Sequence, residues 1–440
     1  MRFAFGEPFG VHHSIKIKNY IMMKRQYILL LIAAGLITIL SSCNKKAGYN
    51  ALIITGQSNH NWQASNPILK LLLEQTGLFK ADILISPEKG GDMTTFNPKF
   101  SKYDVVVLDY NGDSWSDKTN NAFLEYVNNG GGVVVYHAAN NAFPEWEEFN
   151  KIIGLGGWGG RNENSGPFVY YRRNEIFRDT SAGEAGGHGP ASEFMVKTRN
   201  FDHPITKGLS ANWMHGKDEL YSHLRGPAEN MEILATAFSP DPIPEQAAGI
   251  APAVPAFSRR SGRDEPVLMT ITYGKGRIFH TVLGHVDEGG GPALECVGFI
   301  VTFQRGAEWA ASGVVTQEVP FDFPSASGVV LRPGFIETGL EEALANIGSY
   351  DIAKSTRNLT CLQNHIRKIS GDEQALLSLE KRMVTILSGK EASVDSKKLL
   401  LRELSWMGSD YSISAIKELV SNAELKDEAE FALARLQNKN

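Results

Sequence analysis

Residues 130–141 read GGGVVVYHAANN, and this stretch indicates the fold. Three glycines precede an apolar run at 133–136, which predicts a buried strand that turns sharply at His137. Similar apolar runs alternate with patterns of helical spacing: strands are predicted at 51–55, 81–86 and 103–108, and helices at 66–78 and 117–129. This alternation is typical of an α/β fold with a parallel sheet covered by helices.

Ligands of such sheets gather at the carboxyl ends of the strands. The segments just past those ends are Gly56–Trp62, Asp109–Ser114 and His137–Phe143. We therefore expect functional side chains among them.

The chain continues with less regular patterns. Residues 154–192 are rich in glycine and polar residues, and we expect a long functional or covering loop. Strands are predicted at 193–198, 230–238 and 266–273, with a hairpin through Gly274-Lys275-Gly276 into 277–284 and a closing helix at 292–309. The Gly-Lys-Gly turn lacks the spacing of a phosphate-binding loop.

Composition excludes several classes of protein. The 440 residues suggest two or three domains, and the net charge of −5 leaves no basic excess for binding nucleic acid. Three cysteines, Cys43, Cys296 and Cys361, are too few for a disulfide scaffold or a cysteine-based zinc site.

Residues 22–43 read MMKRQYILLLIAAGLITILSSC, a basic start, an apolar run and small residues before Cys43. This pattern is typical of a secretory signal, and its end resembles the lipobox of bacterial lipoproteins, in which the cysteine is lipidated. A single membrane-anchor helix is the alternative. We expect residues 1–47 to be signal and tether, a true start at Met22 or Met23, and a lipid anchor in the bacterial cell envelope, at the periplasmic face of the outer membrane.

The chain changes character near a proline-containing linker at 319–333. Beyond it, residues 334–440 carry leucines at helical spacing and few glycines or prolines. The pattern predicts an all-α domain of HEAT-like helical pairs, with a plain small bundle as the alternative, and a surface that could dock a protein partner. His365 is expected to be structural.

Two candidate groups lie at predicted strand ends. His60 and Trp62 could hold a polar ligand, or their loop could simply cap the next helix. His137 sits at the sharp corner, with Asn140 beside it, and the absence of Ser or Cys there argues against a covalent acyl-enzyme.

A third group gathers one imidazole and two carboxylates within a few residues. His215, Asp218 and Glu219 could bind a metal or transfer protons, with Trp213 and Tyr221 as flanking aromatics of a sugar site. The alternative is a solvated charged loop.

The fourth candidate is His285, at the mouth of the last strand, whereas His280 is mid-strand and expected to be structural. We predict that His137 and His285 converge on one pocket, joined by Asp218 or Glu219, with Trp62 or Trp213 as a sugar platform. Such a group suits a divalent metal such as zinc, held by His137 and His285, or equally a metal-free acid–base pair. The alternative is that His137 is a buried helix-start residue.

Four motifs carry a resemblance to a known family. The series GGGVVVYHAA, FDHPITKGL, MHGKDELY and MTITYGKGRIFHTVLGHV, spread over roughly residues 50–315, resembles the ThuA-like (trehalose-utilisation) family. The resemblance implies a flavodoxin-like fold akin to class I glutamine amidotransferases, over a domain at 48–318. His137 replaces the superfamily's elbow cysteine, so glutaminase activity is not implied.

The resemblance also implies a role in sugar utilisation, through oxidised (3-keto) glycosides or disaccharides. The family's motif positions map onto His137, His215, Asp218, Glu219, Tyr221, Gly284 and His285. Two functions remain open. The first is an enzyme that hydrolyses or eliminates at a C–O bond of a glycoside, and the second is a non-catalytic sugar-binding or scaffold lipoprotein. The titratable groups favour the enzyme.

Overall fold

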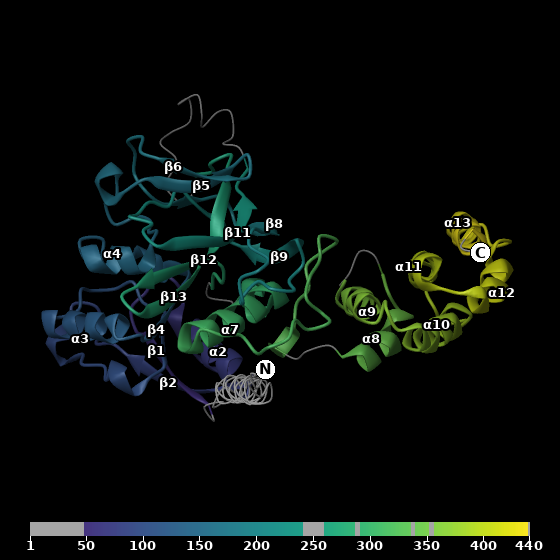
Figure 1. The fold of residues 1–440 in the computed structure, drawn as a ribbon, viewed down its shortest axis with the longest axis horizontal. Helices are drawn as coiled ribbons and strands as arrows, with labels where there is room; N and C mark the ends of the chain where they lie inside the picture. The colour runs from purple at the N-terminus through teal and green to yellow at the C-terminus, as the bar shows by residue number, and fades with distance from the viewer. Residues whose placement is uncertain (1–47, 241–258, 287–290, 336–338, 352–355, 439–440) are drawn as a thin grey trace, which may run out of the picture. The chain divides into compact units, whose positions relative to one another are not determined.

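The structure is a computed structural model, and it describes residues 48–240, 259–286, 291–335, 339–351 and 356–438 (Figure 1). Cys43 and the predicted signal lie outside these residues. Within the described ranges, no helix is both long and apolar enough to span a membrane.

Five parallel strands form the half of the main sheet that carries the site. They are β1 (Tyr49–Thr55), β2 (Phe79–Ile85), β3 (Val105–Leu108), β4 (Gly132–Tyr136) and β13 (Gly276–Thr281), in the order β2-β1-β3-β4-β13. Counted along the chain this is the 2-1-3-4-5 order of flavodoxin-like sheets. The predicted α/β, flavodoxin-like class is confirmed.

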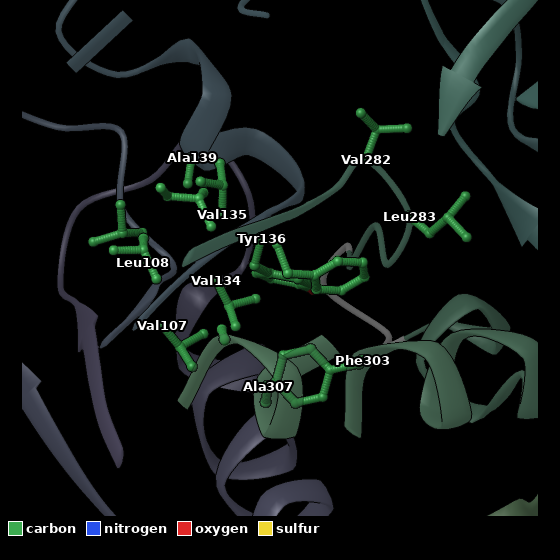
Figure 2. Close-up of a cluster of buried hydrophobic side chains, with 14 of the residues drawn as sticks. Val107, Leu108, Val134, Val135, Tyr136, Ala139, Val282, Leu283, Phe303 and Ala307 are labelled. Carbon is green, nitrogen blue, oxygen red and sulfur yellow. The ribbon is translucent and has the colours of Figure 1, made fainter. Parts of the chain in front are cut away.

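Helices cover both faces of this half-sheet. In Figure 1, α2 (Trp62–Glu74) and α7 (Val297–Ser312) lie on one side, and α3 (Asp117–Asn128) and α4 (Glu147–Ile153) on the other. Figure 2 shows Phe303 and Ala307 of α7 packed against Val134 and Tyr136 of β4. Because strand residues are buried on both faces, the strands read as continuous apolar runs rather than alternating ones.

Helix α2 begins four residues earlier than predicted. The side chain of Asn61 accepts a hydrogen bond from the backbone N–H of Ala64, so Asn61 is the N-cap and the Asn66-Pro67 pair lies inside the helix. The predicted start of this helix at residue 66 is therefore wrong.

The second half of the sheet is antiparallel. It continues from β13 through β12 (Asp264–Tyr273), β11 (Met231–Phe238), β8 (Ser192–Thr198) and β9 (Asn212–Asp218). β12 and β13 form the predicted hairpin, with Gly274 at a φ of +57° in its turn. The sheet as a whole is therefore mixed.

The segment 154–192 is not the loop that its composition predicted. It forms a hairpin of β5 (Phe168–Arg172) and β6 (Glu175–Asp179), turning through Arg173 and Asn174, both with positive φ. A further short strand, β7 (Gly187–His188), pairs with β10 (Tyr221–Ser222). Local pairing satisfies the backbone groups of this segment, and the surrounding glycines obscured the strand pattern.

The proline-containing stretch is also more than a linker. Phe323 packs on Trp213 with ring centroids 5.5 Å apart, and Arg332 donates two hydrogen bonds to Asp322, at 2.7 and 2.6 Å. Val330 belongs to the same core as the sheet. These residues therefore pack as part of the α/β core.

Among the described residues beyond this stretch, six helices share a hydrophobic cluster of their own that includes Leu362, Met383 and Leu400. Their bounds are α8 (Leu340–Ile347), α9 (Arg357–Lys368), α10 (Glu373–Leu387), α11 (Val394–Met407), α12 (Asp410–Leu419) and α13 (Lys426–Gln437). The short α6 (Pro292–Glu295) precedes α7, and 3-10 turns lie at Met93–Thr95, Phe100–Lys102, His137–Asn141, Glu163–Ser165 and Pro333–Phe335. The helical character predicted for residues 334–440 is confirmed.

Candidate functional site

Chemically active side chains meet at the carboxyl edge of the parallel strands. His60 follows β1, Asn111 follows β3, His137 follows β4 and His285 follows β13. Since the strand order reverses direction between β1 and β3, the crevice outside these ends is the expected ligand position of the fold.

His137 is held in one orientation. Its Nδ1–H donates to the carbonyl of Val282 at 2.6 Å, and burial lowers the pKa of the ring, so the neutral tautomer has a bare Nε2. The hydroxyl of Tyr221 lies 3.1 Å from that Nε2. His137 also has a φ of +44°, unusual for a residue with a side chain and a conformation often found at functional sites.

His60 and His285 lie against His137. The ring centroid of His60 is 4.9 Å from that of His137 and 4.7 Å from that of His285, and the His137 and His285 centroids are 5.5 Å apart. Burial and the two neighbouring imidazoles lower the pKa of His60 to about 3. The predicted meeting of His137 and His285 is therefore present in the structure, with a third ring between them.

Glu219 completes the cluster. Its Oε2 lies 3.2 Å from Nδ1 of His285 and 3.9 Å from Nε2 of His137, and its Oε1 lies 3.6 Å from Nε2 of His188. Burial alone would raise the pKa of Glu219, but the His285 hydrogen bond and the charge of the surrounding rings outweigh it and lower the pKa. Glu219 is thus an ionised carboxylate among imidazoles.

The side chains of Asp218 and His215 lie outside this cluster. Both side chains are fully buried, and His215 Nε2 lies 2.7 Å from Asp218 Oδ2. Asp218 also accepts hydrogen bonds from three backbone N–H groups, those of Glu219, Gly284 and His285. This pair therefore faces the protein interior, which corrects its predicted place beside the substrate, and it fixes the backbone beneath the cluster.

Gly284 shows how tightly that backbone is packed. Its φ is +106°, and a Cβ there would lie 2.6 Å from the ring of Tyr136. Only glycine suits this position, which sets the direction in which His285 leaves β13.

A cavity of about 490 Å³ opens beside the cluster. Its lining combines amides, aromatic rings and titratable groups: Asn59, His60, Asn111, Asn141, Trp158, His188, Glu219 and Tyr221. A depression of about 550 Å³ lined by residues such as Lys99, Tyr126 and Gly131 lies elsewhere and contains no imidazole. The titratable side chains therefore favour the cavity beside the cluster as the ligand site.

Only two of the five predicted substrate-binding residues line the cavity. His60 and Tyr221 line the cavity, whereas Trp213 is fully buried against Gly298 and cannot offer a face to a sugar, and Asn140 is buried beside His280. Trp62 starts helix α2 and is not among the lining residues. The predictions of Trp213 as a platform and of Asn140 as a ligand contact are corrected by their burial.

Sequence reasoning missed Trp158 and His188 because both lie in the segment taken as a loop. Asn111 and Asn141 lie within the strand-end segments expected to be functional, but they were not singled out, and neither was Asn59. A lone tryptophan among glycines, as in Gly156-Gly157-Trp158-Gly159-Gly160, is a signal that could have been used.

The cluster also fits a metal ion. His60, His137, Glu219 and His285 each offer one ligand atom, and these four atoms lie within 4.8 Å of one another. Three imidazole nitrogens and a carboxylate oxygen are donors typical of zinc and its first-row neighbours.

Comparison with known proteins identifies the family. The model of the ThuA family, described as trehalose utilisation, matches residues 50–310. This chain belongs to the ThuA family. The match covers the sheet from its second residue, Asn50, onward and every residue of the cluster, so the resemblance found in the four motifs is confirmed.

The chain is also similar to three solved structures, and the first of them agrees with this membership. A thua-like protein from Parabacteroides merdae ATCC 43184 is 50% identical, with a TM-score of 0.61, and the match covers 66% of this chain and all of that one. A thua-like protein from Bacteroides uniformis ATCC 8492 is 22% identical, with a TM-score of 0.39, over 62% of this chain and 98% of that one. A cytoplasmic protein from Salmonella typhimurium is 12% identical, with a TM-score of 0.34, over 61% and 99%. No curated protein matches the chain.

Proposed function

We propose that this ThuA-family protein is an enzyme of carbohydrate utilisation that cleaves a glycosidic C–O bond, with 3-keto glycosides or disaccharides as its substrates. Membership of a trehalose-utilisation family supports a role in carbohydrate use. The cluster at the strand ends supports the chemistry. The observation that carries the proposal is the approach of an ionised Glu219 to His137, His188 and His285 at the wall of a cavity.

A ketone at C3 makes this reaction accessible to such groups. The carbonyl acidifies the neighbouring C2–H, so a general base can remove that proton. The electron pair then forms a C1–C2 double bond as the C1–O bond breaks, and a general acid protonates the departing oxygen. Adding water to the double bond would complete a hydrolysis. Neutral imidazoles and a carboxylate in contact can act as both acid and base in these steps.

The cavity suits a polar ring. Asn59, Asn111 and Asn141 offer amide donors and acceptors for hydroxyl groups, and Trp158 offers an aromatic face beside Tyr221, with centroids 4.9 Å apart. We assign to Trp158 the stacking role expected of Trp62 or Trp213.

The experiment is a turnover screen of glycosides and disaccharides in native and 3-keto forms, followed by nuclear magnetic resonance. We expect release of the aglycone or second sugar from a 3-keto form only. Turnover of no 3-keto form, together with binding of unmodified sugars, would favour the second candidate, a sugar-binding protein without catalysis. The amides and Trp158 would serve that function equally well, but a binder has no use for the imidazole cluster.

We also propose that the chain is a lipoprotein of the cell envelope, anchored through Cys43. The support is the sequence that ends in Leu40-Ser41-Ser42-Cys43. Replacing Cys43 with Ser should abolish lipid labelling and leave a precursor or a released protein. Unchanged labelling would refute the anchor.

A further inference from the structure

We propose that His60, His137, Glu219 and His285 form a binding site for one divalent transition-metal ion, with zinc as the preferred ion. This inference deepens the proposed function, on which its catalytic meaning rests. The ion would face the cavity and polarise a ketone or hydroxyl oxygen of a bound sugar. Its presence can be tested without any sugar.

The first argument is the arrangement of donors. Side chains from four separate parts of the chain bring their ligand atoms within 4.8 Å of one another. In a tetrahedral zinc site with bond lengths of about 2.1 Å, two ligand atoms would be about 3.4 Å apart. Binding must therefore draw at least one side chain inward. His60 and His285 are partly exposed, whereas His137 is buried.

The second argument is the way the ligands are supported. Metal-bound histidines usually donate their other ring N–H to a carbonyl or carboxylate, which fixes the ring. His137 does this with the carbonyl of Val282. Asp218 holds the backbone of both Glu219 and His285, so two further ligands share one buried anchor. A hydrogen-bonded cluster of solvent-facing side chains would not need such support.

The third argument is the kind of donor. Calcium and magnesium prefer oxygen ligands, so three imidazoles and one carboxylate point to a transition metal. Four protein ligands would hold the ion, and the cavity side offers space for a sugar oxygen. His188 and Tyr221 lie next to the ligands without belonging to the set, and they would remain available for proton transfer.

The test is metal stoichiometry. Purified protein is stripped with a chelator, titrated with Zn²⁺, and analysed by mass spectrometry of its metal content. We expect one ion per chain and a melting temperature raised by several degrees. Titration with Co²⁺ should give visible absorption bands of a low-symmetry site with nitrogen ligands. Less than about one fifth of an ion per chain at saturating zinc would overturn the proposal.

Substitution of the proposed ligands tests where the metal ion binds. We expect zinc binding to be about 100-fold weaker or more in each of three variants, His60→Ala, His285→Ala and Glu219→Gln. The control is His365→Ala, which changes a histidine of helix α9 and should bind zinc as the wild type does. Unchanged binding in the first three variants would overturn the site. If a variant fails to fold, the cobalt spectrum of the wild-type protein still decides whether imidazoles bind the ion. Turnover by the metal-stripped protein would refute the catalytic role of the ion alone, and a metal-binding protein without turnover would refute the proposed function alone.

Discussion

The carboxylate of Asp218 accepts a hydrogen bond from the backbone N–H of His285, 67 positions away in the sequence, at 3.1 Å. The same Oδ1 atom accepts the N–H of Glu219 at 2.7 Å. One buried carboxylate thus holds the two residues whose side chains meet at 3.2 Å in the cluster. Because Asp218 does not reach the cavity, it is a positioning residue.

Asp218→Asn should therefore destabilise the fold and disturb the site together. Burial alone would lower the pKa of His215, but Cys296 and Asp218 outweigh it and raise the pKa to about 10, so the ring is charged at neutral pH. Asparagine removes the carboxylate that lies 2.7 Å from this buried charged ring, at a cost of about 3 kcal/mol in unfolding free energy. Urea denaturation measures this. The exposed control Asp202→Asn should change stability by less than about 0.5 kcal/mol, and an equally small effect of Asp218→Asn would argue against the pair.

Part of the site could be predicted because β4 and β13 are parallel neighbours. The carboxyl ends of such strands must meet, and this places His137 beside His285 whatever the details of the loops. His60 follows by the same reasoning from β1. The arrival of Glu219 from the antiparallel half could be guessed only from its local cluster of charges.

The roles of Asp218 and Trp213 could not be predicted from the sequence. Asp218 is the last residue of β9 and Glu219 lies just beyond it, and the pairing of β9 with β8 is irregular between His215 and Asp218, so simple strand alternation does not decide which of the two carboxylates faces the cavity. Trp213 is buried by Phe323 and by close contact with Gly298, both distant in sequence. Tertiary packing decides both cases.

Trp158 should be the sugar platform. Trp158→Ala removes the aromatic face of the cavity and should raise KM, or the dissociation constant of a bound sugar, roughly tenfold. Trp62→Ala is the matched control, since Trp62 lies outside the lining. Steady-state kinetics or calorimetry gives the comparison, and a larger effect of Trp62→Ala would restore the sequence-based assignment.

The helices after residue 339 should be separable, but the cut must follow the packed segment. A chain ending at residue 335 keeps Phe323, Val330 and Arg332 and should melt cooperatively by circular dichroism. A chain ending at residue 318 loses these groups, and its α/β domain should be destabilised by about 3 kcal/mol or more. Loss of cooperative melting in the longer chain would mean that the helices belong to the α/β core.

Stability should fall in acid partly because of His280. Burial lowers the pKa of His280 to about 4, below the value near 6.5 that it has when unfolded, so the unfolded chain binds the proton first. The contribution of the neutral His280 ring to the free energy of unfolding is complete above pH 6.5. It is lost as pH falls from 6.5 to 4, by up to about 1.4 kcal/mol per pH unit. His280→Gln should make the pH dependence of unfolding shallower in this window. Parallel curves for variant and wild type would show that His280 does not contribute.

The turnover of a 3-keto glycoside by Glu219→Gln tests the central claim most directly. Glutamine keeps the size of Glu219 but cannot accept a proton or carry the charge that faces His137, His188 and His285. We predict a fall in kcat of at least about 100-fold with an unchanged melting temperature, since general acid–base groups contribute about that much or more. The exposed control Glu88→Gln should keep the wild-type rate. Wild-type turnover by Glu219→Gln would contradict the assignment of this cluster as the catalytic site.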